Sequence, residues 1–304
     1  MQTTQTSSKP EFNPSKWEAP PCPFCGSTSF RGHEKYGANH RFTYVKCNDC
    51  TLVYQNPRPF YDTNFTAFAY DSYFVTKHYH VQHPGQFNEK ELKLIEDNKN
   101  IMRNLEKLLG RKGRMLEIGS CTGLLLLAAK QLGWDCFGID ISAPMVKFMV
   151  DTYGIPGVAG QYDQLTQIKN EKFDLIYCSH VIEHIPNPNE WMECFKKNLA
   201  PNGIVFIQVP NQYAPDRVLK RVAKDLGLKK DKWHPSRTPD HLYEPHISSM
   251  KYLIHKHGGK IIFLETYSRD DMCNKNVISK IRHNVLKWGN NLRVAFKFSD
   301  NSMT

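Results

Sequence analysis

The stretch Arg114-Met-Leu-Glu-Ile-Gly-Ser-Cys-Thr-Gly-Leu124 decides the fold of this 304-residue chain. Its first half is a short apolar run of the kind that is buried in a parallel sheet. Gly119 and Gly123 bracket a turn into a helical run that ends near Leu132, and glycine lets a ligand approach the backbone closely. Asp140 ends the next apolar run and is placed to accept hydrogen bonds from ribose hydroxyls. The stretch therefore predicts a strand, turn, helix and second strand that cradle a nucleoside cofactor.

The acid before the glycines indicates which nucleoside cofactor is bound. Dinucleotide-binding folds use the pattern Gly-x-Gly-x-x-Gly, whereas this chain reads Glu117-x-Gly119-x-Cys121-x-Gly123. A carboxylate here would repel a pyrophosphate, but it suits a cofactor with an ammonium group and a sulfonium. The segment resembles motif I of the class I S-adenosylmethionine-dependent methyltransferases, with Cys121 in place of the middle glycine. Cys121 is small, and we expect it to fit there if its φ is negative.

Two later segments resemble motifs of the same superfamily, in the expected order and at the expected distances. Residues 173–186 read as a fourth strand that runs into a polar turn with Glu183-His184. Residues 199–210 read as a helix stop, a turn and a fifth strand. The resemblance covers residues 114–210. It implies an α/β fold with a Rossmann-like, doubly wound seven-stranded sheet.

The resemblance also implies which residues contact S-adenosylmethionine. The turn residues, the ribose-binding acid and two residues near the adenine are Glu117, Gly119, Cys121, Gly123, Asp140, Ile141 and Gln161. Ile141 would pack on the adenine face. Many relatives have an aspartate after the third strand that accepts from the adenine amino group. This chain has Gln161 there, whose amide carbonyl can also accept.

Methyl transfer from a sulfonium is a one-step displacement, so the protein mainly holds the donor and acceptor atoms about 3 Å apart. A base is needed only if the acceptor loses a proton, and histidine suits that task near neutral pH. The candidates are His180 and His184 after the fourth strand, and His241 with Tyr243 further along the chain. A second interpretation is that Glu183-His184 caps the helix and braces the turn.

Four of the nine cysteines form two Cys-x-x-Cys pairs: Cys22, Cys25, Cys47 and Cys50. Two such turns supply the tetrahedral four-sulfur shell that zinc prefers, with no position left open for catalysis. The metal would replace the core that so short a segment cannot build, with strands expected at residues 29–31 and 41–46. The alternatives are a redox dithiol and disulfides, and a cytoplasmic compartment disfavours disulfides.

The net charge of +10 comes largely from basic residues after residue 216 and in the tail. This charge favours anionic partners such as phosphorylated or nucleotide-linked sugars, RNA or an anionic membrane surface. A solvated surface that serves solubility is the alternative. No apolar stretch approaches the roughly 20 residues that cross a bilayer, and the N-terminus lacks a secretory core, so we expect a cytoplasmic protein.

The chain divides into five segments. They are a disordered tail (1–18), the zinc ribbon (19–56), an aromatic linker with a docking helix (57–110), the donor-binding domain (111–270) and a basic C-terminal segment (271–304). Residues 211–246 form an insertion that we expect to cover the active site. Further elements are expected as helices at 88–109, 143–153 and 247–257, and as strands at 157–159, 260–266 and 294–298.

The pattern CPxCG…CxxCxLVYxNPRP ahead of this domain resembles a bacterial-type group of zinc-ribbon methyltransferases associated with surface-glycan or secondary-metabolite pathways. It implies methyl transfer to a small-molecule or glycan-linked acceptor, including nucleotide-linked sugars. An RNA methyltransferase would also fit a zinc ribbon with basic patches. However, Ser179-His180-Val181 stands where base-methylating enzymes carry Asn/Asp-Pro-Pro-Tyr/Phe. A third hypothesis is a module that binds the cofactor without turnover.

Overall fold

The computed structural model describes residues 16–36, 42–60, 87–228, 241–268 and 288–298. Within them, seven strands form a central sheet, in the spatial order β12 (Gly259–Tyr267), β13 (Asn291–Phe298), β10 (Leu199–Pro210), β9 (Phe173–Ser179), β6 (Arg114–Ile118), β7 (Asp135–Asp140) and β8 (Gly157–Ala159). β13 runs antiparallel to both of its neighbours, whereas the strands from β10 to β8 pair in parallel. The predicted α/β fold with a seven-stranded sheet is therefore confirmed.

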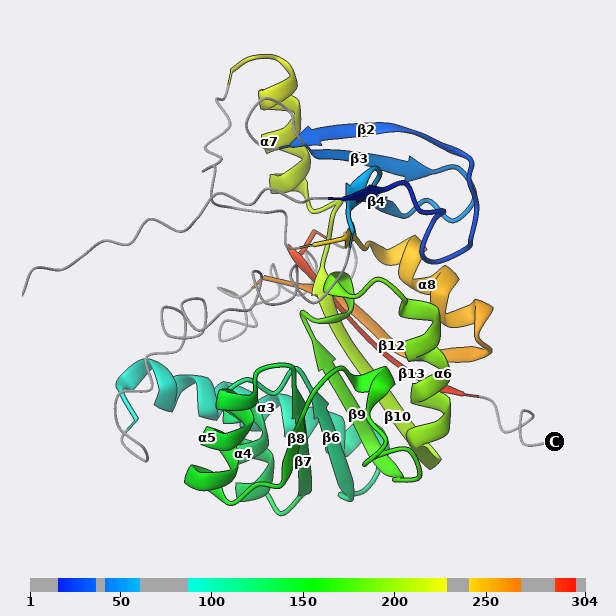
Figure 1. Ribbon diagram of the computed structural model, residues 1–304. Coiled ribbons are helices and arrows are strands. Elements are labelled where there is room, and N and C mark those ends of the chain that lie inside the picture. The colour runs from blue at the N-terminus through cyan, green and yellow to red at the C-terminus, as the bar shows by residue number, and fades with distance from the viewer. Residues whose placement is uncertain (1–15, 37–41, 61–86, 229–240, 269–287, 299–304) are drawn as a thin grey trace, which may run out of the picture.

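Helices cover both faces of this sheet (Figure 1). One hydrophobic cluster contains side chains of α3 (Glu89–Leu109), α4 (Leu124–Gln131) and α5 (Ala143–Tyr153), and the other contains those of α6 (Pro188–Asn198) and α8 (Ile247–Lys256). Strand residues alternate between the two clusters. Met115 and Leu116 of β6 belong to opposite ones, as do Leu175 and Ile176 of β9. Successive strand residues point to opposite faces, so each face of the sheet has its own helical layer.

The predicted element boundaries agree closely with the structure in this domain. The helix at 143–153 and the strand at 157–159 are found as predicted. α3 begins after Asn88, whose side-chain oxygen accepts from the Glu91 backbone N–H at 3.0 Å while the Glu91 carboxylate accepts from the Asn88 N–H at 2.8 Å. The helix is capped by Gly110, whose φ of 82° lies in the left-handed region that glycine adopts easily because it has no Cβ.

The ribbon is a second, four-stranded sheet in the order β11 (Tyr243–Glu244), β4 (Val53–Gln55), β3 (Phe42–Cys47) and β2 (Phe30–Tyr36). β2 and β3 correspond to the two predicted ribbon strands, whereas β4 and β11 were not predicted. β11 comes from the insertion after β10, so distant parts of the chain build one sheet. A short pair, β1 (Trp17–Glu18) with β5 (Arg58–Pro59), lies beside it.

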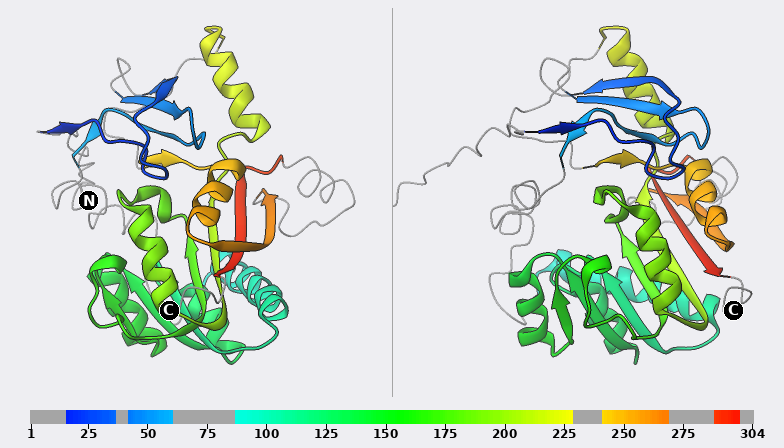
Figure 2. Two further views of the ribbon diagram at one scale, coloured as in Figure 1. Left: turned by 90° about the vertical axis from the view of Figure 1, so that its right-hand side faces the viewer. Right: turned by 45° about the vertical axis from the view of Figure 1, so that its right-hand side comes forward.

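The ribbon packs onto the domain that contains the seven-stranded sheet. Phe24 and Leu52 belong to the same hydrophobic cluster as Leu253 of α8. The Lys256 ammonium of α8 donates to the Phe24 carbonyl at 2.7 Å, and the Asn189 side chain of α6 donates to the Pro23 carbonyl at 2.6 Å. Figures 1 and 2 show the ribbon at the end of the central sheet toward which β9 and β10 point. This is the end where ligands bind in open α/β sheets.

The insertion contains α7 (Pro215–Asp225), which lies beside β2 and β3 in both figures. The rest of the predicted cover, residues 229–240, falls outside the described residues, as do the aromatic stretch at 61–86 and most of the basic tail. The central sheet extends beyond residue 270, because β13 sits between β10 and β12.

Candidate active site

The turn after β6 is built as the glycine pattern predicts. The N–H groups of Gly119 and Ser120 both donate to the Ile139 carbonyl of β7, at 2.8 and 2.9 Å. Gly119 has a φ of 77°, and a Cβ there would lie 2.3 Å from a methyl group of Val181. Gly123, with a φ of 79°, begins α4, and a Cβ there would lie 2.6 Å from Met149. Larger residues at these two positions would collide with Val181 and Met149 and would also be strained at a positive φ.

The expected backbone conformation of Cys121 was wrong. Its φ is +49°, in the left-handed region, which costs a non-glycine residue about 1–2 kcal/mol. Asp140 compensates, because one carboxylate oxygen accepts from the Cys121 N–H and the other from the Ser142 N–H, both at 2.8 Å. One side chain thus joins the loops after β6 and β7.

The other acidic residue of the site is Glu117, near the end of β6, whose side chain is buried with 7% of the residue exposed. Burial raises its pKa well above the usual value, and the neighbouring Asp140 carboxylate raises it further. Burial also raises the pKa of Asp140, against the lowering effect of its two backbone hydrogen bonds. Glu117 Oε2 has no hydrogen-bond partner among the described residues. A ligand with a positive charge and N–H donors would pair with the Glu117 carboxylate and donate a hydrogen bond to its Oε2.

The two residues predicted near the adenine follow the next strands. Ile141 comes directly after β7 and Gln161 after β8, and both are partly exposed. The Gln161 amide oxygen accepts from the Gln164 side chain at 2.8 Å, and Gln161 immediately precedes the short 3-10 helix Tyr162–Gln164. All seven predicted donor-contacting residues thus lie at or beyond the carboxyl ends of β6, β7 and β8.

Replacing Asp140 with alanine should weaken binding of S-adenosylhomocysteine by roughly 10- to 100-fold. The change removes the proposed ribose acceptor, and one hydrogen bond to a charged group is worth about 1.5–3 kcal/mol. It also removes the two backbone hydrogen bonds that hold the turn. Isothermal titration calorimetry measures the loss. The exposed Asp151 of α5 provides the matched control, because its carboxylate forms an ion pair with Lys147 of the same helix. Equal affinity for the Asp140 and Asp151 variants would contradict this assignment.

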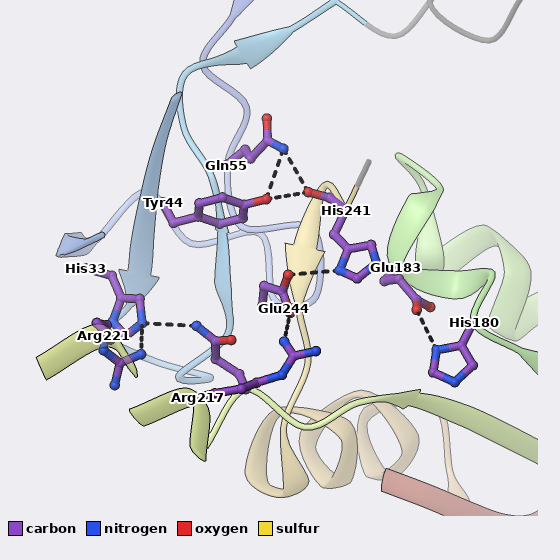
Figure 3. Close-up of polar contacts among 10 residues, drawn as sticks. His33, Tyr44, Gln55, His180, Glu183, Arg217, Arg221, His241 and Glu244 are labelled. Carbon is purple, nitrogen blue, oxygen red and sulfur yellow. Dashed lines mark hydrogen bonds and ion pairs between the residues drawn. The ribbon is translucent and has the colours of Figure 1, made fainter. Parts of the chain in front are cut away.

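A cluster of histidines and glutamates follows β9 (Figure 3). His180, with a φ of 54°, donates its backbone N–H to the Gln208 carbonyl at 2.9 Å. Its Nδ1 lies 3.3 Å from Oε1 of Glu183, which is fully buried in the 3-10 helix Ile182–His184. The same loop contacts the donor turn through Val181, which packs against Gly119. The donor turn and this histidine loop are therefore adjacent.

His241 joins this cluster from the insertion. The His184 and His241 rings meet edge to face, with centroids 4.9 Å apart. Two ribbon side chains hold the His241 backbone, since the Tyr44 hydroxyl and the Gln55 amide each donate to its carbonyl at 2.7 Å. Its ring Nδ1 lies 2.8 Å from Oε1 of Glu244 (Figure 3). The three predicted catalytic histidines are thus brought together.

Carboxylates on two sides control the protonation of His241. Burial alone would lower its pKa, but Glu244 and then Glu183 raise the pKa to about 9. For Glu183, burial favours a higher pKa, which the contacts with His180, His184 and His241 outweigh, so the pKa is lowered. Burial is likewise outweighed for Glu244 by His241 and by Arg217, whose Nη1 lies 3.1 Å from Oε2. Near neutral pH, both acids are ionised and His241 is mostly protonated.

This arrangement predicts a pH-dependent stability. The pKa of His241 is raised from 6.5 to about 9 on folding. The stabilisation is therefore complete below about pH 6.5 and is lost as the pH rises through about 9, by up to about 3 kcal/mol. Urea unfolding between these pH values should show the fall in wild-type protein and a smaller fall in His241→Gln. The same fall in both proteins would argue against the raised pKa.

Tyr243 occupies a different position from the histidines. It is fully buried, its hydroxyl donates to the Ile182 carbonyl, and its ring meets Phe24 edge to face at 5.1 Å. Its backbone pairs with Tyr54 between β11 and β4. Burial raises its pKa well above the usual value. These contacts join the ribbon to the histidine loop, which suits a structural role.

Sequence reasoning left three residues out of the site: Tyr44, Gln55 and Glu244. Glu244 carried a detectable signal, because it follows His241 by three residues in a short polar segment. Tyr44 and Gln55 carried none, since they reach His241 from almost 200 residues away.

The four ribbon cysteines converge as predicted. Their Sγ atoms all lie within 4.8 Å of one another, with Cys22 to Cys50 at 3.3 Å and Cys25 to Cys47 at 3.5 Å. Four thiols at this spacing fit a tetrahedral zinc shell with Zn–S bonds of about 2.3 Å. Glu183, His184 and His241 also present ligand atoms within 4.8 Å of one another, so they could hold a cation.

The family model described as a methyltransferase domain matches residues 87–262, more than half of the chain. The chain belongs to this methyltransferase family. The match includes the donor turn, the histidine loop and His241, and it leaves β2, β3 and β4 of the ribbon outside. Among the described residues of the methyltransferase, no helix is long and apolar enough to cross a membrane.

Curated relatives include ubiquinone biosynthesis O-methyltransferases. That of Pasteurella multocida (strain Pm70) is 28% identical over 143 residues, which are 42% of this chain and 58% of the relative. That of Agrobacterium fabrum (strain C58 / ATCC 33970) is 27% identical over 209 residues, 64% of this chain and 82% of the relative. The first match thus spans little more than half of the relative's length.

Among solved structures, magnesium protoporphyrin IX methyltransferase from Synechocystis PCC 6803, determined with bound SAH, is similar with a TM-score of 0.52. It is 16% identical, and the match covers 78% of this chain and 100% of that chain. The likeness shows a shared fold.

Proposed function

We propose that this methyltransferase transfers the methyl group of S-adenosylmethionine to a small-molecule or glycan-linked acceptor. The observation that carries the proposal is the adjacency of two groups of side chains. The buried acids Glu117 and Asp140 lie at the donor turn, and the loop with Glu183 and His184 touches that turn through Val181. Family membership supports the reaction, while the acceptor class rests on resemblance.

The donor fits the chemistry of the turn. When bound, S-adenosylmethionine supplies an electrophilic methyl group on a sulfonium. Glu117, whose Oε2 has no hydrogen-bond partner among the described residues, would face the ammonium end of the donor. Asp140 would accept from the ribose hydroxyls with the lone pairs left by its two backbone hydrogen bonds. Ile141 and Gln161 would contact the adenine.

We assign His241 as the general base. Because Glu244 occupies Nδ1, the neutral ring carries its proton there and leaves Nε2 for an acceptor hydroxyl. The proton passes from the acceptor oxygen to Nε2 as that oxygen gains the methyl group. His180 and His184 orient the acceptor by hydrogen bonds, and the buried Glu183 holds the His180 ring. Tyr243 braces the loop.

Incubation with methyl-labelled donor and fractionated cell extract tests the function. We expect label in a small-molecule or glycan fraction. Label in RNA would support the RNA methyltransferase instead. Donor binding without transfer to any fraction would support a non-catalytic module, and calorimetry that detects no donor binding to folded protein would contradict all three. The ribbon surfaces that contact β11, α6 and α8 are already buried, which disfavours their use for RNA.

A cation held by Glu183, His184 and His241 is a second candidate mechanism, because their ligand atoms converge. The general-base and cation mechanisms are distinguished by treating the protein with a chelator under conditions that leave the ribbon metal in place. Activity should persist if His241 acts as a base. Loss of activity that Mg²⁺ or Mn²⁺ restores would support the cation.

We also propose a cytoplasmic location for this protein. Four free thiols that bind zinc are stable in a reducing compartment, where disulfides rarely form.

A further inference from the structure

An apolar stripe runs along the exposed side of α7. Leu219, Val222 and Leu226 follow one another at helical spacing and are 72%, 45% and 67% exposed. The helical hydrogen bonding reaches Leu226, whose N–H donates to the Val222 carbonyl at 3.0 Å. Leu228, just beyond it, is 78% exposed. These four side chains are called the α7 stripe below.

The polar side of α7 faces the protein instead. Nη1 of Arg217 lies 3.1 Å from Glu244 of β11, and Nη1 of Arg221 lies 3.0 Å from the His33 ring of β2. Surface helices normally bury the apolar face and expose the charges. α7 is oriented the opposite way, so its apolar side is left for another partner.

The charge around the stripe indicates which partner. Residues 215–228 contain four lysines and arginines against two aspartates. Lys220 of α7 is exposed, and the sequence continues past Leu228 with Lys229 and Lys230. Leucine and valine side chains flanked by cations match a helix that lies in the interface of an anionic bilayer. The stripe has none of the aromatic anchors that are common at protein interfaces.

We propose that the α7 stripe docks this protein on anionic membrane surfaces, with the helix lying in the plane of the interface. Arg217 links α7 to Glu244, which contacts His241, so the docking helix is joined to the candidate site through side-chain contacts. The docking stands independently of the acceptor's identity.

Sedimentation with vesicles tests this proposal on the full chain. The wild type should bind vesicles of phosphatidylcholine with phosphatidylglycerol and should bind pure phosphatidylcholine vesicles far less. Leu219→Ser/Leu226→Ser should reduce the binding roughly tenfold or more. The matched control is Leu92→Ser/Leu94→Ser on α3, which changes two leucines that are 54% and 46% exposed and should bind as the wild type does. Circular dichroism confirms that both variants fold.

Three outcomes would overturn the proposal. The first is a wild type that does not sediment with the anionic vesicles, and the second is equal binding by the two double variants. The third is a dimer, detected by light scattering, that the Leu219→Ser/Leu226→Ser change dissociates, because the stripe would then bind a second copy. Binding that weakens with added salt supports the electrostatic part of the docking.

Discussion

Cys22→Ser/Cys25→Ser protein is expected to lose bound zinc and to lose methyl transfer by at least roughly 100-fold, although neither cysteine belongs to the histidine cluster. Zinc at the four converging thiols would hold the ribbon, since so small a sheet has little core of its own. The ribbon in turn holds His241 through Tyr44 and Gln55. Elemental analysis and a methyl-transfer assay measure the two losses.

The matched control is Cys194→Ser, which changes a partly buried free cysteine of α6. It should keep both zinc and activity. Tyr44→Phe separates this effect from unfolding, because it removes one hydrogen bond to the His241 carbonyl and leaves the thiols intact. Its rate should fall by roughly fivefold, as expected for about 1 kcal/mol. Full activity in zinc-free protein would show that the ribbon does not position the site.

His241→Gln is expected to lower kcat by about 100- to 10,000-fold, the usual range for a positioned acid–base group. Affinity for the donor product should stay within about twofold, because the donor turn is formed by other residues. The exposed His255 of α8 is the control, and His255→Gln should match the wild type. A small change in kcat for His241→Gln would remove the general base from the mechanism.

The pH profile adds a readout that a purely structural role would not change. With its pKa raised to about 9, His241 becomes a base only as the pH rises, so kcat/KM should increase up to about pH 9. Of the two carboxylates that raise the pKa of His241, Glu244 has the larger effect. Glu244→Gln removes its charge and should therefore shift the rise of kcat/KM to lower pH. If the rise of kcat/KM occurs at the same pH in Glu244→Gln as in the wild type, the titrating group is a residue other than His241.

The donor side of the site was predictable because its residues are close together in the chain. Gly119, Cys121 and Gly123 lie in one turn, and Asp140 ends the next strand. The conformation of Cys121 was not predictable, since its positive φ depends on a hydrogen bond from its N–H to the Asp140 carboxylate. A motif specifies residue types in a turn, whereas the dihedral angle depends on contacts with a neighbouring loop.

By itself, the sequence determined the α/β class, the donor turn, the two Cys-x-x-Cys pairs and the histidines, because local spacing encodes each of them. Only the tertiary structure decided that the ribbon sheet includes β11, that Glu183 and Glu244 flank His241, and that the apolar side of α7 faces outward. These features join segments far apart in the chain. Their contacts form through strand pairing and burial, which short-range patterns do not record.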